Sequence, residues 1–444
     1  MQTSFSLTQL LDPQVASSEK ILRACVHCGF CTATCPTYVL LGDELDSPRG
    51  RIYLIKEMLE QEKPPTREVV KHIDRCLSCL ACMTTCPSGV HYMHLIDHAR
   101  ARVEKTYKRP IADRMLRALL ARVLVDPGLF RLAAVAGVIA RPLAPVFELL
   151  GLRRMAAMLR LTPRRKLAPP VDRVGKVYPA EGTRRGRVAL LSGCINPVLA
   201  PSTNEAAIRL LNRNGIEVVI AAGEACCGSL AHHMGHEEEA LARARNNIDA
   251  WARELDGPGI DAILVTVSGC GTTLKDYGFM LRGDPAYATK AARISARVRD
   301  ITEYLVSLNL RDATAPAPLT VAYHSACSLQ HGQKVMSEPK ELLRKSGFVV
   351  RDVPEGHLCC GSAGTYNILQ PKLAEQLRAR KVANIERLRP DVIAAGNIGC
   401  ITQLASGTAI PVVHTVELLD WATGGPVPES LANLRFHAAA QAQE

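Results

Sequence analysis

The chain has few aromatic residues and lacks a long hydrophobic run. Phe, Trp and Tyr make up 4% of its 444 residues, and they are not interleaved with basic residues as in many nucleic-acid-binding surfaces. The longest uncharged, strongly apolar stretch near the middle of the chain is 132–140, far shorter than the ~20 residues of a membrane-spanning helix. We therefore expect neither a nucleic-acid partner nor a span across a membrane.

The N-terminal residues also lack the basic and apolar segments of a secretory signal peptide. The 16 cysteines are then expected to lie in a reducing compartment, where thiols bind metals rather than form disulfides. We expect a cytoplasmic protein, with a peripheral position on the inner face of the cytoplasmic membrane as a further option.

Two copies of one cysteine pattern, C-x-x-C-x-x-C-x-x-x-C-P, stand near the start of the chain. In bacterial ferredoxins this run holds [4Fe–4S] clusters, and its fourth cysteine ligates the other cluster. Structural zinc or disulfides would not explain two such runs of four cysteines with a trailing proline. We therefore predict two clusters, cluster 1 on Cys25, Cys28, Cys31 and Cys86, and cluster 2 on Cys76, Cys79, Cys82 and Cys35.

A second set of eight cysteines belongs to an internal repeat. Cys194, Cys226 and Cys227 recur 133 residues later as Cys327, Cys359 and Cys360, and Cys270 recurs as Cys400. In both copies strands alternate with helices, which predicts two duplicated α/β domains with mainly parallel sheets packed face to face. The cysteines follow the predicted strands, where open α/β sheets place their sites.

The role of these eight cysteines stays open between three interpretations. They could hold a further iron–sulfur cluster near the pseudo-symmetric interface, carry out thiol or disulfide redox chemistry, or be buried structural residues. Histidines near them could handle protons or a quinone, or could be ordinary polar residues: His232, His233, His324, His331 and His357.

The net charge of +11 is concentrated in residues 101–187, where 20 Lys and Arg face 6 Asp and Glu. This segment is rich in leucine, alanine and valine with helical spacing. It could dock on an anionic membrane or an acidic partner subunit, or it could form solvated linker helices packed on its neighbours.

The predicted fold class is a multidomain α+β protein. We expect helices starting at Ser47–Pro48 and spanning roughly 66–75 between the two cysteine runs. The predicted domains are a helical two-cluster ferredoxin-type domain at 1–105, a basic helical linker at 106–186, and α/β repeats at 187–315 and 316–444.

These motifs together resemble a known family. Tandem cluster runs followed by two CCG repeats resemble the cysteine-rich iron–sulfur electron-transfer subunits of heterodisulfide reductase, anaerobic glycerol-3-phosphate dehydrogenase, L-lactate oxidation and glycolate oxidase. Several segments are most similar to the glycolate oxidase subunits, namely 23–38, 42–56, 241–251, 268–271 and 357–366.

The resemblance implies a role in oxidising glycolate to glyoxylate, with the chemistry on a separate flavin-binding subunit and electrons passing to a quinone or other membrane acceptor. The chain has no motif for a flavin or for hydroxy-acid oxidation, so we expect no catalytic residues on it. The same role in lactate or glycerol 3-phosphate oxidation, or a disulfide reductase built on the CCG repeats, stays open. One difference from the heterodisulfide reductase repeats is that their final C-x-x-C is here Cys270–Thr273 and Cys400–Gln403, with one cysteine fewer per repeat.

Overall fold

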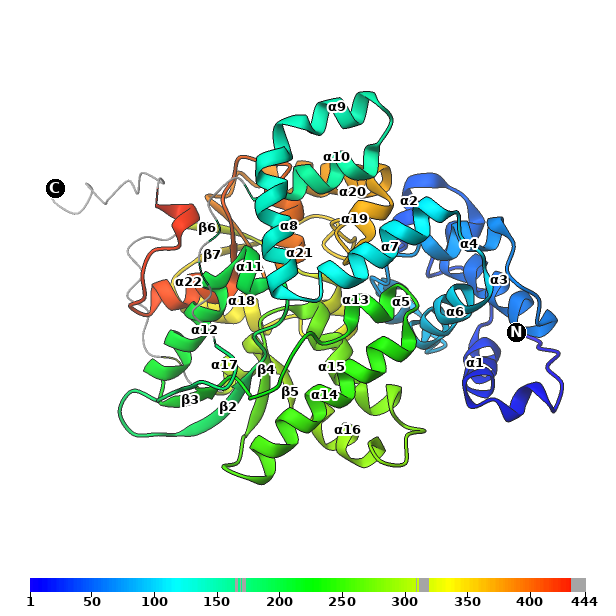
Figure 1. Cartoon of the computed structure of the whole chain (residues 1–444). Coiled ribbons are helices and arrows are strands. Elements are labelled where there is room, and N and C mark those ends of the chain that lie inside the picture. Colours follow the sequence, from blue (N-terminus) through cyan, green and yellow to red (C-terminus); the bar gives the residue numbers. More distant parts are fainter. Residues whose placement is uncertain (164–166, 168, 170–172, 309, 311–318, 433–444) are drawn as a thin grey trace.

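The computed structural model describes residues 1–163, 167, 169, 173–308, 310 and 319–432. It has a helical N-terminal region, a group of helices in the middle of the chain, and two α/β units (Figure 1). This confirms the predicted fold class. The expected boundary between the two repeats, at 315/316, lies outside the described residues.

The N-terminal region packs its helices around a core that includes Leu22, Ile55, Ile73 and Leu95. The predicted helix starts are confirmed: Ser47 accepts a hydrogen bond from Gly50 N, and Thr66 accepts one from Val69 N, as N-cap residues do. The helices are α1 (Pro13–Ala24), α2 (Pro36–Leu41), α3 (Pro48–Gln61), α4 (Arg67–Asp74), α5 (Ala81–Thr85) and α6 (Tyr92–Thr106), with 3-10 turns η1 (Gln9–Leu11) and η2 (Glu44–Asp46).

The basic segment forms helices of two kinds. Helix α7 is tied to the N-terminal region by buried arginines: Arg109 bonds Asp74 and Glu104, and Arg117 bonds Asp74 and Asp113. Of the helices after it, α8 and α10 pack against the two repeats, and α9 lies at the outer edge of the molecule (Figure 1). The bounds are α7 (Ile111–Val123), α8 (Pro127–Ala140), η3 (Arg141–Leu143), α9 (Ala144–Leu149) and α10 (Arg153–Leu161).

The first α/β unit contains a five-stranded sheet of order β1-β3-β2-β4-β5, parallel except for the edge strand β1. Its strands are β1 (Val177–Tyr178), β2 (Gly186–Leu190), β3 (Ile216–Val219), β4 (Ala262–Val265) and β5 (Val298–Asp300). Its helices are α11 (Asn196–Leu199), α12 (Pro201–Arg213), α13 (Ser229–His233), α14 (Glu237–Asp256), α15 (Ser268–Met280), α16 (Ala288–Ser295) and α17 (Ile301–Ser307).

The second unit repeats this arrangement with four parallel strands in the order β7-β6-β8-β9. The strands are β6 (Thr320–His324), β7 (Val349–Asp352), β8 (Val392–Ala395) and β9 (Val412–His414). The helical elements are η4 (Ser328–Gln333), α18 (Glu338–Lys345), α19 (Tyr366–Leu369), α20 (Pro371–Glu386), α21 (Ile398–Ala405), α22 (Thr415–Ala422) and η5 (Glu429–Leu431).

The two α/β units share one hydrophobic core. Val188 and Leu264 of the first sheet belong to the same buried cluster as Val321 and Val392 of the second. Helices α12 and α22 pack together there, and the buried carboxylate of Asp420 on α22 receives Arg209 and Arg213 from α12 at 2.6 and 2.5 Å. The units are therefore joined by their cores as well as by the chain.

Candidate iron–sulfur sites

The structure brings the eight N-terminal cysteines together in two groups. One small cavity is lined by Cys25, Cys28, Cys31 and Cys86, with Cys82 beside them. A neighbouring one is lined by Cys35, Cys76, Cys79 and Cys82. The fourth cysteine of each run thus lies with the first three of the other, which is the grouping that crossed ligation requires.

The backbone of the two cysteine loops has a repeated conformation that the sequence did not suggest. Ser78 and Leu80 have positive φ values of 48° and 61°, and His27 and Gly29, at the equivalent positions of the first run, have φ of 55° and 86°. Residues other than glycine seldom adopt this conformation, which costs about 1–3 kcal/mol and is usually kept at functional sites. It turns three cysteines of each loop toward one point.

A buried arginine stands beside the second group. The Arg51 side chain is 1% exposed, pairs with Asp46 at 3.1 Å, and has Nη1 3.8 Å from Cys35 Sγ. Burial alone would lower the pKa of Arg51, but the negative charges of Cys76, Cys35 and Asp46 hold it above its ordinary value. A fixed positive charge at this place would favour the reduced form of a cluster.

The buried thiols fit a metal cluster by their chemistry. Burial raises the pKa of Cys79 and Cys82 well above the ordinary value, and the charges of neighbouring cysteines raise it further. Cysteines bind metals as thiolates, so this group needs a compensating cation before it can be charged. Iron supplies that charge, and the clusters when bound accept and release single electrons.

All eight cysteines of the CCG repeats line one large cavity of about 620 Å³. Each follows the carboxyl end of a strand or begins the helix after it, as predicted. Cys327 Sγ lies 3.8 Å from Cys359 Sγ, and Gly361 N donates to Cys359 Sγ at 3.4 Å. In the first repeat Cys194 and Cys227 donate to Cys226, which lowers the pKa of Cys226 and raises that of both partners. The two sets of four thiols therefore converge from pseudo-symmetric positions.

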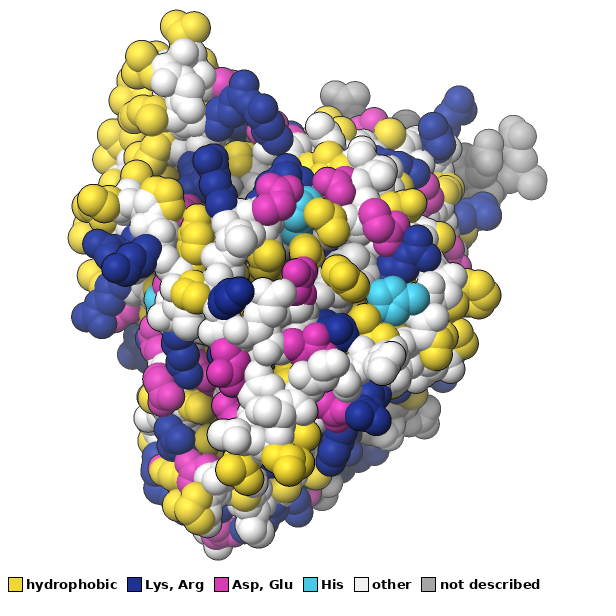
Figure 2. Space-filling model, turned by 90° about the vertical axis from the view of Figure 1, so that its right-hand side faces the viewer, with side chains coloured by type: hydrophobic (Ala, Val, Ile, Leu, Met, Phe, Trp, Pro, Cys, Tyr) yellow, Lys and Arg dark blue, Asp and Glu magenta, His cyan; other side chains and the backbone are white. Residues whose placement is uncertain are grey.

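Helices α7, α8 and α10 form an apolar wall of this cavity, with side chains such as Leu120, Phe130, Ala134 and Leu161. The other face of α8 is open to solvent: Leu132 is 69% exposed and Ile139 is 76% exposed. Hydrophobic side chains gather along the upper left edge of Figure 2, at the end of the molecule where Figure 1 places α8 and α9. One side of α8 thus faces the cavity, and the other is an exposed hydrophobic surface.

This surface corrects the expectation that no segment approaches the length of a membrane span. The continuous helical stretch Pro127–Leu149 has 23 residues, a mean hydropathy of 1.6 and only 11% of its most apolar window buried, and it is long and apolar enough to cross a membrane by length and composition. Arg131 lies within α8, and Arg141 begins the 3-10 turn η3, so neither arginine ends the helical stretch. Helix α9 turns away from the direction of α8 after η3 (Figure 1), and α8 alone, at ~1.5 Å per residue, is about 21 Å long against a ~30 Å hydrocarbon layer.

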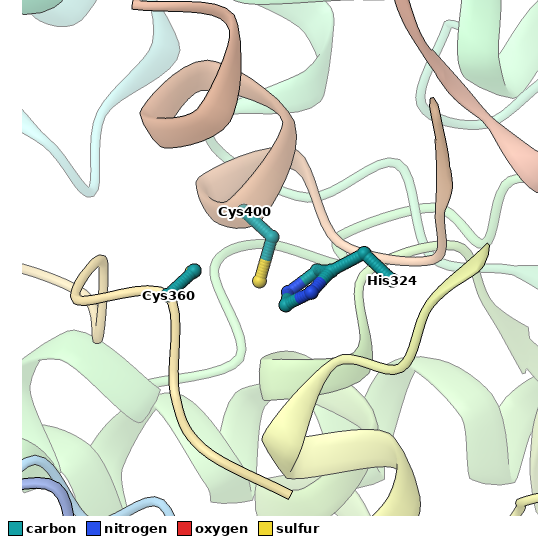
Figure 3. A group of neighbouring side chains, drawn as sticks. All are labelled: His324, Cys360 and Cys400. Atoms are coloured by element: carbon teal, nitrogen blue, oxygen red, sulfur yellow. The ribbon is translucent and has the colours of Figure 1, made fainter. Parts of the chain in front are cut away.

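The histidines singled out in the sequence lie in different surroundings. His233 lines the cavity, and its neighbour His232 pairs with the buried Asp97 at 3.2 Å. His331 contacts Thr84 Oγ1 at 2.8 Å, and its Nε2 lies 3.2 Å from the carbonyl of His357. His324 is buried beside Cys360 and Cys400 (Figure 3). The sequence did not indicate a role for Arg51 or Asp97. The only signal it offers for them is that a charged residue stands at a helix position that otherwise faces the core.

Family models match most of the regions described. Residues 21–90 match a "4Fe-4S dicluster domain", and residues 188–275 and 321–405 each match a "Cysteine-rich domain". The chain is 44% identical to the glycolate oxidase iron–sulfur subunit of Escherichia coli K12 over 95% of its own length and 99% of that protein. It is 31% identical to the probable glycolate oxidase iron–sulfur subunit of Bacillus subtilis 168, over 91% and 94% of the two chains. Lactate utilization protein A of Geobacillus thermodenitrificans is 27% identical over 53% of this chain and 98% of its own length.

Proposed function

Because the chain belongs to the family of glycolate oxidase iron–sulfur subunits, we propose that it is the electron-transfer subunit of a complex that oxidises glycolate to glyoxylate. Each glycolate gives up two electrons and two protons, and a flavin on a partner subunit is the group that takes them together. This chain supplies thiolates for two [4Fe–4S] clusters that accept the electrons singly. Cluster 1 is assigned to Cys25, Cys28, Cys31 and Cys86, and cluster 2 to Cys76, Cys79, Cys82 and Cys35.

The observation that carries this proposal is the contiguity of the cysteine groups. Cys82 lines both N-terminal cavities, and Cys79 lies in one buried cluster with Cys359. A third iron–sulfur centre in the CCG repeats extends the series toward the large cavity. Electrons can pass between metal sites that lie next to one another, so this arrangement favours electron transfer over a purely structural role for the cysteines.

A membrane quinone is the acceptor we assign to this chain. The large cavity is apolar on the side of α7, α8 and α10, where the quinone would lie, and has on the other side the cysteines that would hold the third centre. His233 is a polar group in its wall, with His232 and Asp97 behind it as a route for protons. Two electrons and two protons convert a quinone to a quinol, which balances the oxidation of one glycolate.

The exposed hydrophobic face of α8 and α9 supports a peripheral position on the inner face of the cytoplasmic membrane. Apolar side chains such as Leu132, Ile139 and Leu149 would enter the interface, and nearby arginines would meet anionic headgroups. This location brings the apolar wall of the cavity close to the lipid in which quinones dissolve.

The test is anaerobic copurification of the chain with its flavin subunit from the native cytoplasm. Glycolate, lactate or glycerol 3-phosphate is then added in turn, and bleaching of the cluster absorbance is followed. We expect glycolate alone to bleach the clusters at a rate matching turnover. Bleaching by lactate instead would favour the second candidate, a lactate-oxidising complex, to which the similarity with lactate utilization protein A points. Bleaching by none of the three, with reduction of added disulfides, would favour a thiol reductase.

A further inference from the structure

His324 lies at the end of strand β6 and has no ordinary reason to be buried there. Its side chain is 1% exposed, and neither ring nitrogen has a hydrogen-bond partner among the described residues. His414, equally buried at the end of β9, uses both nitrogens, one at 2.8 Å from Thr266 O and one at 3.1 Å from Val416 N. Because buried polar groups are almost always satisfied, two free nitrogens on one buried ring point to a partner of another kind.

The partner is indicated by what the ring faces. One ring nitrogen of His324 and the sulfurs of Cys360 and Cys400 all lie within 4.8 Å of one another. In Figure 3, Cys400 on α21 points toward the imidazole, and Cys360 approaches from the loop on the other side. Two donors bound to one metal ion at about 2.3 Å (sulfur) and about 2.0–2.1 Å (nitrogen) lie at most about 4.6 Å apart, so a shift of a few tenths of an ångström brings these three donors onto one ion.

The two repeats differ at this position. With the repeats aligned on Cys194 and Cys327, His324 corresponds to Leu191. Leu191 is buried in a hydrophobic cluster with Ala189, Val219 and Cys227. The second repeat therefore has a buried imidazole at the position where the first repeat has an apolar side chain.

We propose that His324 is an iron ligand, completing with Cys327, Cys359, Cys360 and Cys400 the donor set of an iron–sulfur centre in the second repeat. The proposal rests on the proposed function only in that the chain carries such clusters. A neutral imidazole among thiolates lowers the negative charge of the centre, and in Rieske centres this substitution raises the reduction potential. The first repeat, with Leu191, has no equivalent donor.

The test is pulsed EPR on the full chain, purified anaerobically with ¹⁵N-labelled histidine and partly reduced. We expect a strongly coupled ¹⁵N on one iron–sulfur signal, as directly bound imidazole gives. His324→Leu, which copies the first repeat, should abolish this coupling, and His324→Cys should restore the iron content without it. His331→Leu is the matched control, because that ring is also buried but has hydrogen bonds to both nitrogens, and the coupling should persist in it.

Several results would overturn the assignment. These are absence of strong ¹⁵N coupling in the wild-type chain, its persistence in His324→Leu, or zinc in place of iron at this site by metal analysis. The outcome is separate from the proposed function, since glycolate-dependent bleaching of the ferredoxin-type clusters does not depend on the ¹⁵N signal. Glycolate-dependent bleaching without ¹⁵N coupling would reject His324 as a ligand but leave the proposed function standing. ¹⁵N coupling without bleaching would support the ligand and reject the proposed function.

Discussion

Cys79 of the N-terminal region and Cys359 of the second repeat lie in the same buried hydrophobic cluster, with Cys327 packed against it. Cys79 is also close enough for the charge of Cys327 to raise its pKa, after burial, which is the larger cause. Because the first repeat makes no such contact through its own cysteines among the described residues, the second repeat is the nearer continuation of the electron path.

The first prediction concerns the cluster ligands. Cys28→Ser and Cys79→Ser should each lower the iron content by about four atoms per chain, because each removes a ligand of one [4Fe–4S] cluster. Iron and acid-labile sulfide analysis with EPR will measure this. Thr34→Ser, in the same loop but without a thiol, is the control. Full iron in both cysteine variants would contradict the ligand assignment.

The second prediction concerns the buried Arg51. Arg51→Met leaves Asp46 with one partner fewer in a buried position, so we expect a loss of about 3–5 kcal/mol in the free energy of unfolding. Arg49→Met removes a partly exposed pair with Glu44 and should cost at most about 1 kcal/mol. Anaerobic denaturant unfolding compares the two. Equal effects would show that burial of the Arg51 pair does not matter.

The third prediction is a pH dependence from Asp300. Burial raises its pKa to about 6, against hydrogen bonds from Thr302 that act in the opposite direction. The folded chain then holds this proton more tightly than the unfolded chain, so stability is full below the unfolded pKa and falls as pH rises through about 6, by about 3 kcal/mol in all.

Asp300→Asn, which keeps an acceptor for the helix α17 cap, removes this dependence. The stability of the Asn variant relative to wild type should therefore increase between about pH 4 and 7, the range between the unfolded and folded pKa values of Asp300. Unfolding midpoints at several pH values will measure it, and a constant difference between the two proteins would refute the prediction.

The fourth prediction separates the two faces of α8. Ala134 is buried and lines the large cavity, so Ala134→Phe should raise the quinone concentration needed for half-maximal turnover about tenfold, since overfilling a packed site costs about 1–3 kcal/mol. Val135→Phe, on the exposed face, should not. Both are measured with a soluble quinone, with a dye that accepts electrons directly as the reference. The same response from both variants would reject the cavity as the quinone site.

The fifth prediction tests the membrane surface. Replacing Leu132, Ile139 and Leu149 by serine should weaken binding to vesicles of anionic lipid about 1,000-fold or more, because each side chain of this size contributes about 1.5–3 kcal/mol when fully buried. The iron content should not change. The arginines of the basic segment are less suitable for this test. Arg154, next to Arg153, already pairs with Asp113 at 2.6 Å, and Arg164 and Arg165 lie outside the described residues. Unchanged cosedimentation with vesicles would favour linker helices.

The sequence predicted most where spacing alone carries the information. The cysteine runs, the duplication and the strand–helix alternation led to the fold class and to the grouping of the cysteines, because ligand spacing and strand periodicity are local properties. Arg51 and His324 could not be recognised in this way. Each takes its role from side chains outside its own helix or strand, Asp46 and Cys35 for Arg51 and Cys360 and Cys400 for His324.

The basic segment was the hardest part to predict, because two kinds of helix share one composition. Arg117 on α7 has carboxylates from another element to bind, and the outer residues of α8 do not pack on the body of the chain. In the sequence, the charges of Arg131 and Arg141 marked the two ends of a short apolar run. In the structure, the helical stretch Pro127–Leu149 contains both arginines. Only the three-dimensional arrangement distinguishes the helix that packs on its neighbours from the one that is exposed.

The shared core of the two repeats restricts how a ligand can reach the cavity between them. Separating the repeats would expose the common core to water and break the ion pairs of Asp420 with Arg209 and Arg213. Opening the cavity in this way is therefore energetically unfavourable. The remaining boundary is the wall of α7, α8 and α10, and none of the described residues of these helices belongs to that core. Under the proposed function, a lipophilic acceptor would therefore enter the cavity past these helices, and the two repeats would keep their relative positions.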